Sequence, residues 1–355
     1  MPAINPLSNP KSIKLNCELC GKVAYIQCQF CRVTYYCSKE HQTTDWNGIH
    51  VKICQLLVPL RTQAKLLGSE EERRNKEKDI RRNQKALLEM TRTEAQKHLH
   101  ESNFELAIPA ALQSLRFSMD LNGSSSIDLV PSYLLLGEAS IGLNRYPQAE
   151  EYLSLAKYAV LKKPDCSHAM RSQLHRNFGK LYASLGKYDE ALEQLAADIY
   201  YSSLAMGPEH EGTTGGYYHM GNVFVAQEQY ESALAMYEKV VEIWYMTLNE
   251  AVRTLEDTNV ELIDEAVTAE SLQMLQRILK IREEHLGVIH TATAECHHIL
   301  GLLYRYMRNY EKAREHTVKA LELFTETAGL DHPSRQIVQQ SLNYFDQFQE
   351  HNGYL

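Results

Sequence analysis

Six of the eight cysteines lie between Cys17 and Cys54, where they combine with two histidines into four short pairs. The pairs are Cys17-x2-Cys20, Cys28-x2-Cys31, Cys37-x3-His41 and His50-x3-Cys54. A C-x2-C knuckle places two thiolates on one tight turn, and two ligands four residues apart lie on one face of a helix. Because zinc takes four such ligands, the pairs predict two closed zinc sites. A closed site has no position for water or substrate, so the metal would be structural.

Other chemistry fits these cysteines less well. A disulfide framework is typical of secreted chains, whereas residues 1–16 contain three prolines, two lysines and no apolar stretch of the length that a secretory signal needs. A redox C-x-x-C motif would follow a strand of a βαβ unit, a pattern that the sequence lacks. No window approaches the roughly 18 apolar residues of a membrane span. We therefore expect a cytoplasmic chain with reduced thiols, in which the isolated Cys166 and Cys296 are small buried side chains.

One stretch of the cysteine-rich segment resembles a known family. Tyr36-Cys37-Ser38-Lys39-Glu40-His41-Gln42, followed by Asp45-Trp46, His50 and Cys54, is similar to the MYND-type zinc finger. The resemblance covers 17–54 and implies interleaved ligation, with Cys17, Cys20, Cys37 and His41 on one zinc and Cys28, Cys31, His50 and Cys54 on the other. His41 stands where the family usually has cysteine, and an imidazole preserves the site as Cys3His. The His50-Val51-Lys52 sequence also departs from the family's His-Lys pair.

The same resemblance implies a binding surface. MYND fingers bind short proline-containing peptides rather than DNA, and Gln42 and Trp46 would belong to the peptide surface. The alternative for Trp46 is a packing residue of the small fold. We also expect the finger to have a core separate from that of the residues that follow.

Residues 55–90 are predicted to form a helical connector. Residues 70–82 mix acidic and basic side chains at helical spacing, and the chain contains no glycine or proline from 69 to 108. The interspersed acidic residues argue against a localisation or nucleic-acid patch, so we expect a solvated helix that joins the finger to the next segment.

The rest of the chain repeats with a period of 42 residues. An aromatic residue followed after two positions by alanine marks each unit, at Phe104, Tyr146, Tyr188, Tyr230 and Tyr310. A glycine lies nine positions earlier in four units, at Gly137, Gly179, Gly221 and Gly301. The pattern predicts stacked pairs of helices that approach closely at the glycines. The interval of 80 before Tyr310 predicts a degenerate unit near 250–288, where the array bends or bulges, and residues 328–345 are predicted to form a closing helix.

Histidines keep step with the repeat. His168, His210, His290 and His332 are spaced by 42, 80 and 42 residues. Each recurs at the turn into the next unit's first helix, so the four cannot converge on one ion, and we expect turn roles. The His297-His298 pair is predicted to lie on a helix surface and in packing rather than to bind metal.

These units resemble tetratricopeptide (TPR) repeats of the kinesin-light-chain style, from about residue 91 to 345. The predicted fold class is mainly α: an N-terminal two-zinc MYND finger followed by an α-solenoid of long TPR repeats. Residues 1–16 would be a flexible N-terminus, and 346–355 a C-terminal tail.

Composition and motifs restrict the function. The net charge of −8 argues against broad nucleic-acid binding. The sequence contains no G-x-x-x-x-G-K, G-x-S-x-G or H-E-x-x-H motif, so no catalysis is expected. A relative of the SET-type lysine methyltransferases would have to lack the catalytic domain, because no strand-rich block of the required size exists. Two classes remain open: an assembly scaffold, and a chaperone adaptor that clamps a C-terminal carboxylate. Leu134 and Glu138 do not fit such a clamp, which favours the scaffold.

The first helix of each unit is expected to present the partner surface. The predicted inward residues form a cationic and polar set suited to an acidic peptide, and the alternative is a solvated face without a ligand. They are Arg176, Lys180, Tyr218, Asn222, His298 and Arg305. The order of finger and repeats resembles MYND–TPR proteins of cilia and sperm flagella, which implies an axonemal setting with TPR and dynein-associated proteins as partners.

Overall fold

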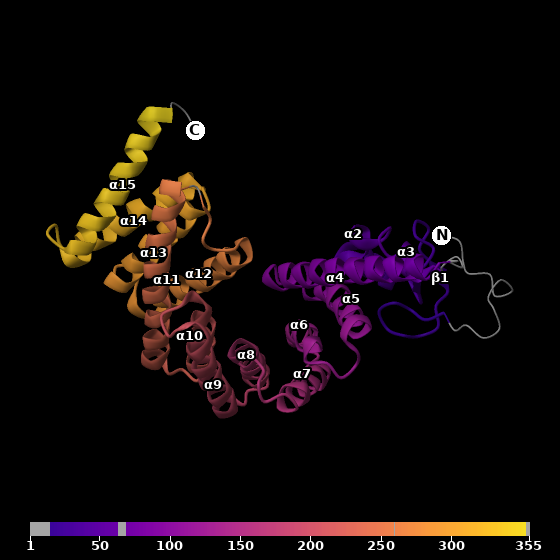
Figure 1. The fold of residues 1–355 in the computed structure, drawn as a ribbon. Helices are drawn as coiled ribbons and strands as arrows, with labels where there is room; N and C mark the ends of the chain where they lie inside the picture. The colour runs from indigo at the N-terminus through magenta and orange to yellow at the C-terminus, as the bar shows by residue number, and fades with distance from the viewer. Residues whose placement is uncertain (1–14, 63–68, 259, 353–355) are drawn as a thin grey trace. The chain divides into compact units, whose positions relative to one another are not determined.

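The computed structural model describes residues 15–62, 69–258 and 260–352, and it is mainly α-helical (Figure 1). The chain divides into two compact units, Met1–Leu185 and Gly186–Leu355. Most of the predicted flexible N-terminus lies outside the described residues. Among the helices in the described ranges, none combines the length and the apolar composition that a bilayer crossing requires.

The first unit begins with the finger. Strands β1 (Ile26–Gln27) and β2 (Tyr35–Tyr36) pair antiparallel, and α1 (Lys39–Asp45) follows. The Ser38 hydroxyl caps α1 by accepting the amide hydrogen of His41 at 3.3 Å, which fixes the turn that carries that imidazole. The finger ends in two short elements, η2 (Trp46–His50) and α2 (Val51–Ile53), and α3 (Val58–Arg61) begins the connector, of which residues 63–68 lie outside the described residues.

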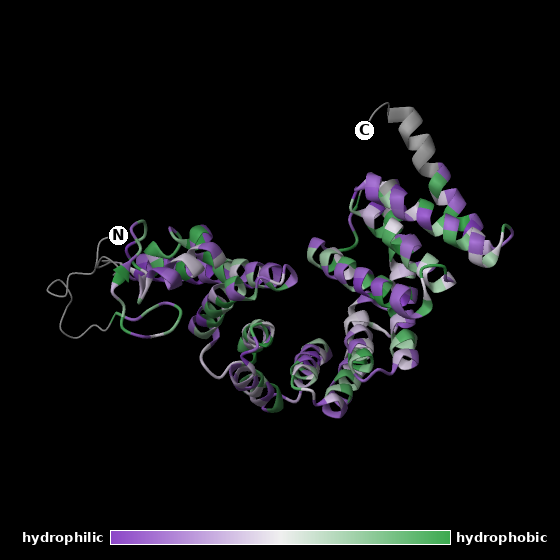
Figure 2. Cartoon of the chain, turned by 180° about the vertical axis from the view of Figure 1, so that it is seen from behind, coloured by the Kyte–Doolittle hydropathy of each residue, from purple (hydrophilic) through white to green (hydrophobic). Residues whose placement is uncertain are grey.

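Helical pairs make up the rest of each unit. The first unit continues with α4 (Glu70–His100), α5 (Phe104–Asn122), η3 (Ile127–Leu129), α6 (Val130–Gly142), α7 (Tyr146–Leu161) and α8 (His168–Ser184). The second contains α9 (Tyr188–Met206), η4 (Glu211–Thr213), α10 (Thr214–Ala226), α11 (Tyr230–Thr258), α12 (Glu265–Leu286), α13 (Thr291–Tyr306), α14 (Tyr310–Ala328) and α15 (Pro333–Asn352). Most of these helices carry both hydrophilic and hydrophobic residues (Figure 2), as amphipathic packing requires.

Each repeated aromatic is the first residue of a helix: α5, α7, α9, α11 and α14 begin at the five anchors. Two residues before each anchor the backbone is left-handed, with φ between 57° and 72°. These five turn residues are Ser102, Asn144, Gly186, Glu228 and Arg308. A single left-handed residue lies in each of these turns between successive helices, and the variety of residue types hides the turn from a search for glycine.

The repeat glycines allow close helix contact, as predicted for Gly221. A Cβ atom at Gly221 would lie 2.5 Å from Cε1 of Tyr237, and one at Gly137 would lie 2.7 Å from Cδ2 of Leu153. Gly301 faces Thr317 in the same way, at 2.7 Å from Oγ1. The sequence predicts the same contact for Gly179, which is buried in α8.

Three of the four periodic histidines have the expected turn role. Nδ1 of His210 accepts from the amide of Gly212 at 3.1 Å, and Nδ1 of His290 accepts from Ala292 at 3.1 Å. His332 makes the equivalent bond, at 3.3 Å, to the amide two residues later. His168 is instead the first residue of α8, whose cap is the preceding serine. An unprotonated imidazole nitrogen thus replaces the usual serine or aspartate at three helix starts.

The predicted separation of the finger core from the helical core is wrong. Ile49, Ile53 and Leu57 at the end of the finger pack in one buried cluster with Leu87 of α4 and Leu136 of α6. A finger of this size cannot bury these side chains within its own fold, so they are buried against the helices instead. The finger is therefore an integral part of the first unit.

The connector also differs from its predicted extent. Helix α4 continues past residue 90 to His100 and packs along α5 as the first helix of a pair. Its exposed first half is strongly hydrophilic (Figure 2), in agreement with the predicted solvated helix. An ion pair of Arg74 with Glu70, at 2.6 Å, joins successive turns there.

The described residues of the degenerate unit form two long helices that pack like the other units. Helix α11 continues from Tyr230 to Thr258, and both it and α12 pack against α13. Trp244 and Leu248 of α11 share one buried cluster with Leu275 and Ile278 of α12. Near the C-terminus, Gly329 with φ 85° caps the end of α14, and α15 starts at Pro333 rather than at 328. Residues 346–352 of the predicted tail continue α15.

Candidate metal centres and binding surfaces

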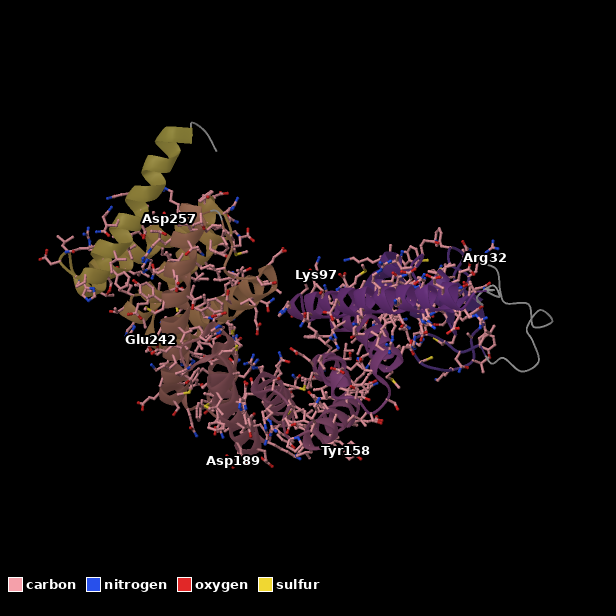
Figure 3. The ribbon with its side chains drawn as sticks, in the orientation of Figure 1. Arg32, Lys97, Tyr158, Asp189, Glu242 and Asp257 are labelled. Carbon is pink, nitrogen blue, oxygen red and sulfur yellow. The ribbon has the colours of Figure 1, made fainter. Side chains whose placement is uncertain are left out.

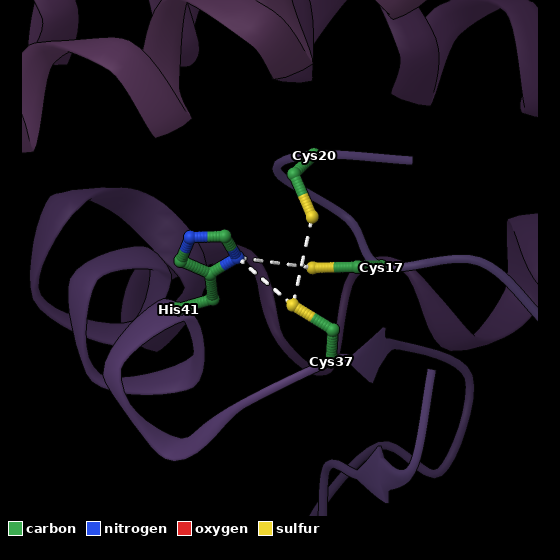
Figure 4. Close-up of side chains that lie close together, drawn as sticks. All are labelled: Cys17, Cys20, Cys37 and His41. Carbon is green, nitrogen blue, oxygen red and sulfur yellow. Dashed lines mark hydrogen bonds between the residues drawn. The ribbon is translucent and has the colours of Figure 1, made fainter. Parts of the chain in front are cut away.

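The first group of predicted ligands converges from the knuckle before β1 and from the start of α1 (Figure 4). Nδ1 of His41 lies 3.4 Å from Sγ of Cys17 and 3.3 Å from Sγ of Cys37. Sγ of Cys20 lies 3.5 Å from Sγ of Cys37. All four ligand atoms are within 4.8 Å of one another, with Cys17 buried and Cys20 exposed.

The second group is fully buried and consists of Cys28, Cys31, His50 and Cys54. Sγ of Cys28 lies 3.9 Å from Sγ of Cys54, and Sγ of Cys31 lies 3.6 Å from Nε2 of His50. The sequence order of the pairs therefore alternates between the two groups, as the MYND resemblance implies.

The spacing of both groups fits tetrahedral zinc. With Zn–S bonds of about 2.3 Å and Zn–N bonds of about 2.0 Å, tetrahedral geometry separates neighbouring ligand atoms by about 3.5–3.8 Å. The contacts in the two groups range from 3.3 to 3.9 Å. Sulfur and imidazole donors without a carboxylate suit a borderline-soft ion such as zinc rather than calcium or magnesium.

The thiols are electrostatically uneven within each group. Burial raises the pKa of Cys17, but hydrogen bonds from backbone amides outweigh it and lower that pKa to about 6. Burial likewise opposes the hydrogen bond from His50 that helps lower the pKa of Cys31 to about 6. Burial and the neighbouring thiols raise the pKa of Cys37 to about 11 and that of Cys54 to about 12. In each group, one thiol therefore ionises easily, and repulsion between thiolates opposes ionisation of a second. A bound divalent cation removes this repulsion.

The sequence did not identify the groups that orient His50. Oδ2 of Asp45 lies 3.6 Å from Nδ1 of His50 and accepts the Tyr36 hydroxyl at 2.6 Å. Burial raises the pKa of Asp45, and burial with the Asp45 charge raises that of Tyr36. At 3.6 Å the two atoms are not hydrogen-bonded in this structure, but Asp45 lies where a carboxylate orients a metal-binding imidazole. The only sequence signal was the position of Asp45 within the MYND-like stretch.

Glu18, inside the first knuckle, is a second residue that the sequence did not identify. Its Oε1 accepts from Nη2 of Arg61 at 2.6 Å and from Nε2 of Gln113 at 2.6 Å, and Arg116 contacts it as well. The side chain is 9% exposed. Burial alone would raise the pKa of Glu18, but the charges of Arg116 and Arg61 hold it below its usual value. Glu18 therefore links the knuckle to α3 and α5.

A cavity of about 200 Å³ opens beside the second group, between the β1–β2 turn and α1. Gln42 and Trp46 line it together with Phe30, whose ring stacks on Trp46 at a centroid distance of 5.3 Å. Phe30 is 67% exposed, whereas Gln42 is buried and its Oε1 has no hydrogen-bond partner within the described part of the chain. The predicted peptide residues thus lie together at one hollow.

The predicted partner residues of the helices are already engaged. In the first unit, Nζ of Lys180 lies 2.5 Å from Oε1 of Glu138. In the second unit, the amide oxygen of Asn222 accepts the Tyr237 hydroxyl at 2.8 Å, and the half-buried Tyr218 ring lies 6.2 Å from the Tyr237 ring. Arg176 of the first unit and Arg305 of the second are half-buried.

The predicted cationic character is wrong around His298. Its side chain is buried, and burial lowers the pKa of His298 to about 4, so the ring is neutral at physiological pH. It lines a cavity of about 230 Å³ together with Glu238, Glu242 and Glu295. The surroundings are therefore acidic, because α11 and α13 each direct glutamates to this side.

Comparisons with known proteins match both halves of the architecture. Residues 17–54 match the family model of the MYND finger, and residues 170–245 and 294–326 match models of the tetratricopeptide repeat. Over the finger, Programmed cell death protein 2 of Mus musculus is 47% identical across 38 residues, which are 11% of each chain. Egl nine homolog 1 of Homo sapiens is 50% identical across 40 residues, which are 11% of this chain and 9% of that protein.

Over the helices, the similarity is lower. Protein KINESIN LIGHT CHAIN-RELATED 1 of Arabidopsis thaliana is 25% identical across 145 residues, which are 39% of this chain and 24% of that protein. All of these matches span a quarter or less of the relatives' own lengths. Among solved structures, the apo form of RapI aligns with a TM-score of 0.39 at 16% identity, covering 75% of this chain and 72% of that one.

Proposed function

We propose that this chain is a non-enzymatic scaffold whose finger, stabilised by two zinc ions, binds a short peptide and whose helical units hold further proteins. Cys17, Cys20, Cys37 and His41 would bind one zinc, and Cys28, Cys31, His50 and Cys54 the other. With four protein ligands each, both ions are structural and hold the peptide surface in shape.

The hollow at Gln42 and Trp46 carries the proposal. It is lined by Gln42, whose buried amide oxygen has no partner among the described residues, and by the stacked rings of Phe30 and Trp46. A proline ring packs against flat aromatic faces, and a neighbouring backbone amide of the peptide can donate to the buried oxygen. This combination matches the proline-containing ligands that the MYND resemblance implies.

Tryptophan fluorescence tests this part directly, because the chain has two tryptophans and Trp244 is 1% exposed. A series of short proline-containing peptides should change the emission of Trp46, and the same peptides with alanine in place of proline should not. Gln42→Ala should weaken binding about tenfold or more. The exposed Gln55→Ala is the matched control and should bind as the parent does. Equal binding of the proline and alanine peptides would contradict the proposal.

The helices support a scaffold better than a carboxylate clamp. A clamp needs uncommitted cations on the first helices, and the ammonium of Lys180 is already neutralised by Glu138. From the resemblance in the order of finger and repeats, we propose the axoneme as the setting and TPR or dynein-associated proteins as partners. Affinity capture from ciliated tissue, followed by mass spectrometry, tests this setting. Recovery of chaperones through their C-termini instead would favour the adaptor.

A further inference from the structure

We propose that the acidic cavity of the second unit is a docking pocket for an arginine side chain of a partner protein. The inference rests on the proposed scaffold function and adds the chemistry of one partner segment. The cavity, of about 230 Å³, lies among α11, α13, α14 and α15. Glu242, which lines it, is labelled in Figure 3.

The charges around the cavity do not balance. Three carboxylates line it: Glu238, Glu242 and Glu295. Arg282, 1% exposed, contacts Glu238 and lies 3.8 Å from Glu295, so one cation serves two carboxylates. Nζ of Lys239 lies 2.6 Å from Glu242 in an exposed pair that is weak in water. Among the described residues that these contacts name, three negative and two positive groups leave one negative charge for a guest.

The charge of Glu295 is poorly compensated. Burial and the charge of Glu238 raise its pKa, and Arg282 only partly opposes them. A carboxylate destabilised in this way gains from a second cation placed against it. Its side chain is 39% exposed, so a guest reaches it from solvent.

A second observation points independently to a ligand. His298 lines the same cavity, is 5% exposed, and its Nε2 has no hydrogen-bond partner among the described residues. A buried polar atom without a partner is costly, and a donor supplied by a guest removes that cost. Since the ring is neutral, Nε2 can accept a hydrogen bond from an N–H group of the guest, and the ring does not repel a cation.

The remaining lining selects the shape of the guest. Val241, Ile299 and Phe324 are apolar and would pack around the aliphatic part of an arginine side chain. The ring of Tyr245 lies 5.7 Å from the ring of His298, measured between centroids. A guanidinium has five N–H donors in one plane and stacks on aromatic faces, so it serves two carboxylates and the imidazole together. Arginine on a protein segment therefore fits the cavity better than a compact ammonium.

Fluorescence anisotropy on the full chain tests the pocket. The probe is a labelled Ala-Leu-Arg-Leu-Ala peptide, and its comparison is the same peptide with neutral citrulline in place of arginine. The arginine peptide should bind at least tenfold more tightly. The double variant Glu242→Gln, Glu295→Gln should lose this preference. Glu311→Gln with Glu322→Gln changes the net charge equally at exposed positions of α14 and should retain it.

Two further readouts separate the outcomes. With carbon-13 in the histidine rings, the His298 resonance should shift with the arginine peptide and not with citrulline. Equal binding of both peptides, or displacement of the peptide by equimolar spermidine, would overturn the proposal. In lysate capture, a parent chain that recovers no protein contradicts the scaffold function itself. A double variant that recovers the same proteins as the parent contradicts only the arginine pocket.

Discussion

Lys180 and Glu138 occupy the same position in consecutive 42-residue units, one residue after the repeat glycine, and their charged atoms lie 2.5 Å apart. The pair joins α8 to α6, so one repeat is bonded to the next by side chains that the repeat itself aligns. Burial alone would raise the pKa of Glu138, but the Lys180 ammonium holds it below its usual value. Lys180, which the sequence predicts to bind a partner, therefore forms an ion pair that joins two repeats.

Reversing one charge of this pair should destabilise the first unit. Lys180→Glu places two carboxylates together and should lower the free energy of unfolding by about 1–2 kcal/mol. The swap Glu138→Lys with Lys180→Glu should recover most of the loss, as urea denaturation can measure. A swap variant no more stable than Lys180→Glu would show that the pair contributes through packing alone.

Loss of zinc should affect more than the finger. We expect two zinc ions per chain in elemental analysis of reduced protein. In Cys28→Ser, hydrogen exchange in α4–α6 should accelerate because Ile49, Ile53 and Leu57 leave the core that they share with these helices. Exchange in α10–α14 should not change. Cys166→Ser, outside both groups, is the control and should keep both ions and the parental exchange. Unchanged protection of α4–α6 in Cys28→Ser would mean that the finger core is independent after all.

The spacing of cysteines and histidines predicted the four ligand pairs, because knuckles and i, i+4 pairs are local geometry, whereas the assignment of the pairs to two groups came from the MYND resemblance. The repeat aromatics similarly marked the helix starts, since each begins a helix with a local cap or turn. What the sequence did not reveal depends on contacts between distant segments. Glu18 and Arg116 lie 98 positions apart, and no local pattern connects them. The burial of Ile49 against α4 and α6 is of the same kind.

The acidity around His298 shows the same limit. Its spacing from Gly301 correctly places it on α13, a first helix. Its environment, however, depends on more than Glu295 of α13 itself, because α11 adds Glu238 and Glu242 from the preceding repeat. A helical period assigns a residue to a face, but the charge of that face depends on the neighbouring helix.

The ion pair of Glu18 should make stability depend on pH in a defined direction. The folded pKa of Glu18 lies below its unfolded value of about 4.3, so the stabilisation is present above that value and is lost as the pH falls through the folded pKa. Glu18→Gln should cost about 2 kcal/mol at pH 7, because Arg61 and Arg116 lose their shared carboxylate. The difference in free energy of unfolding between parent and variant should narrow below about pH 4. Glu105→Gln, at an exposed position, should show no gap, and a gap that widens in acid would contradict this sign.

Gly221 and Gly212 provide a matched test of the helix contact, since an added Cβ meets an atom at 2.5 Å at both positions. At Gly221 the atom belongs to the ring of Tyr237, which is fully buried and bonded through its hydroxyl to Asn222, so α10 and α11 must separate. At Gly212 the atom is the terminal methyl of Met206, a partly exposed and flexible side chain that can move.

Gly221→Ala should therefore lower the free energy of unfolding by about 1–3 kcal/mol, and Gly212→Ala by well under about 1 kcal/mol. Thermal and urea denaturation of the two variants measure the difference. Equal stabilities would mean that the glycine at this point of the repeat is not required for the approach of the two helices.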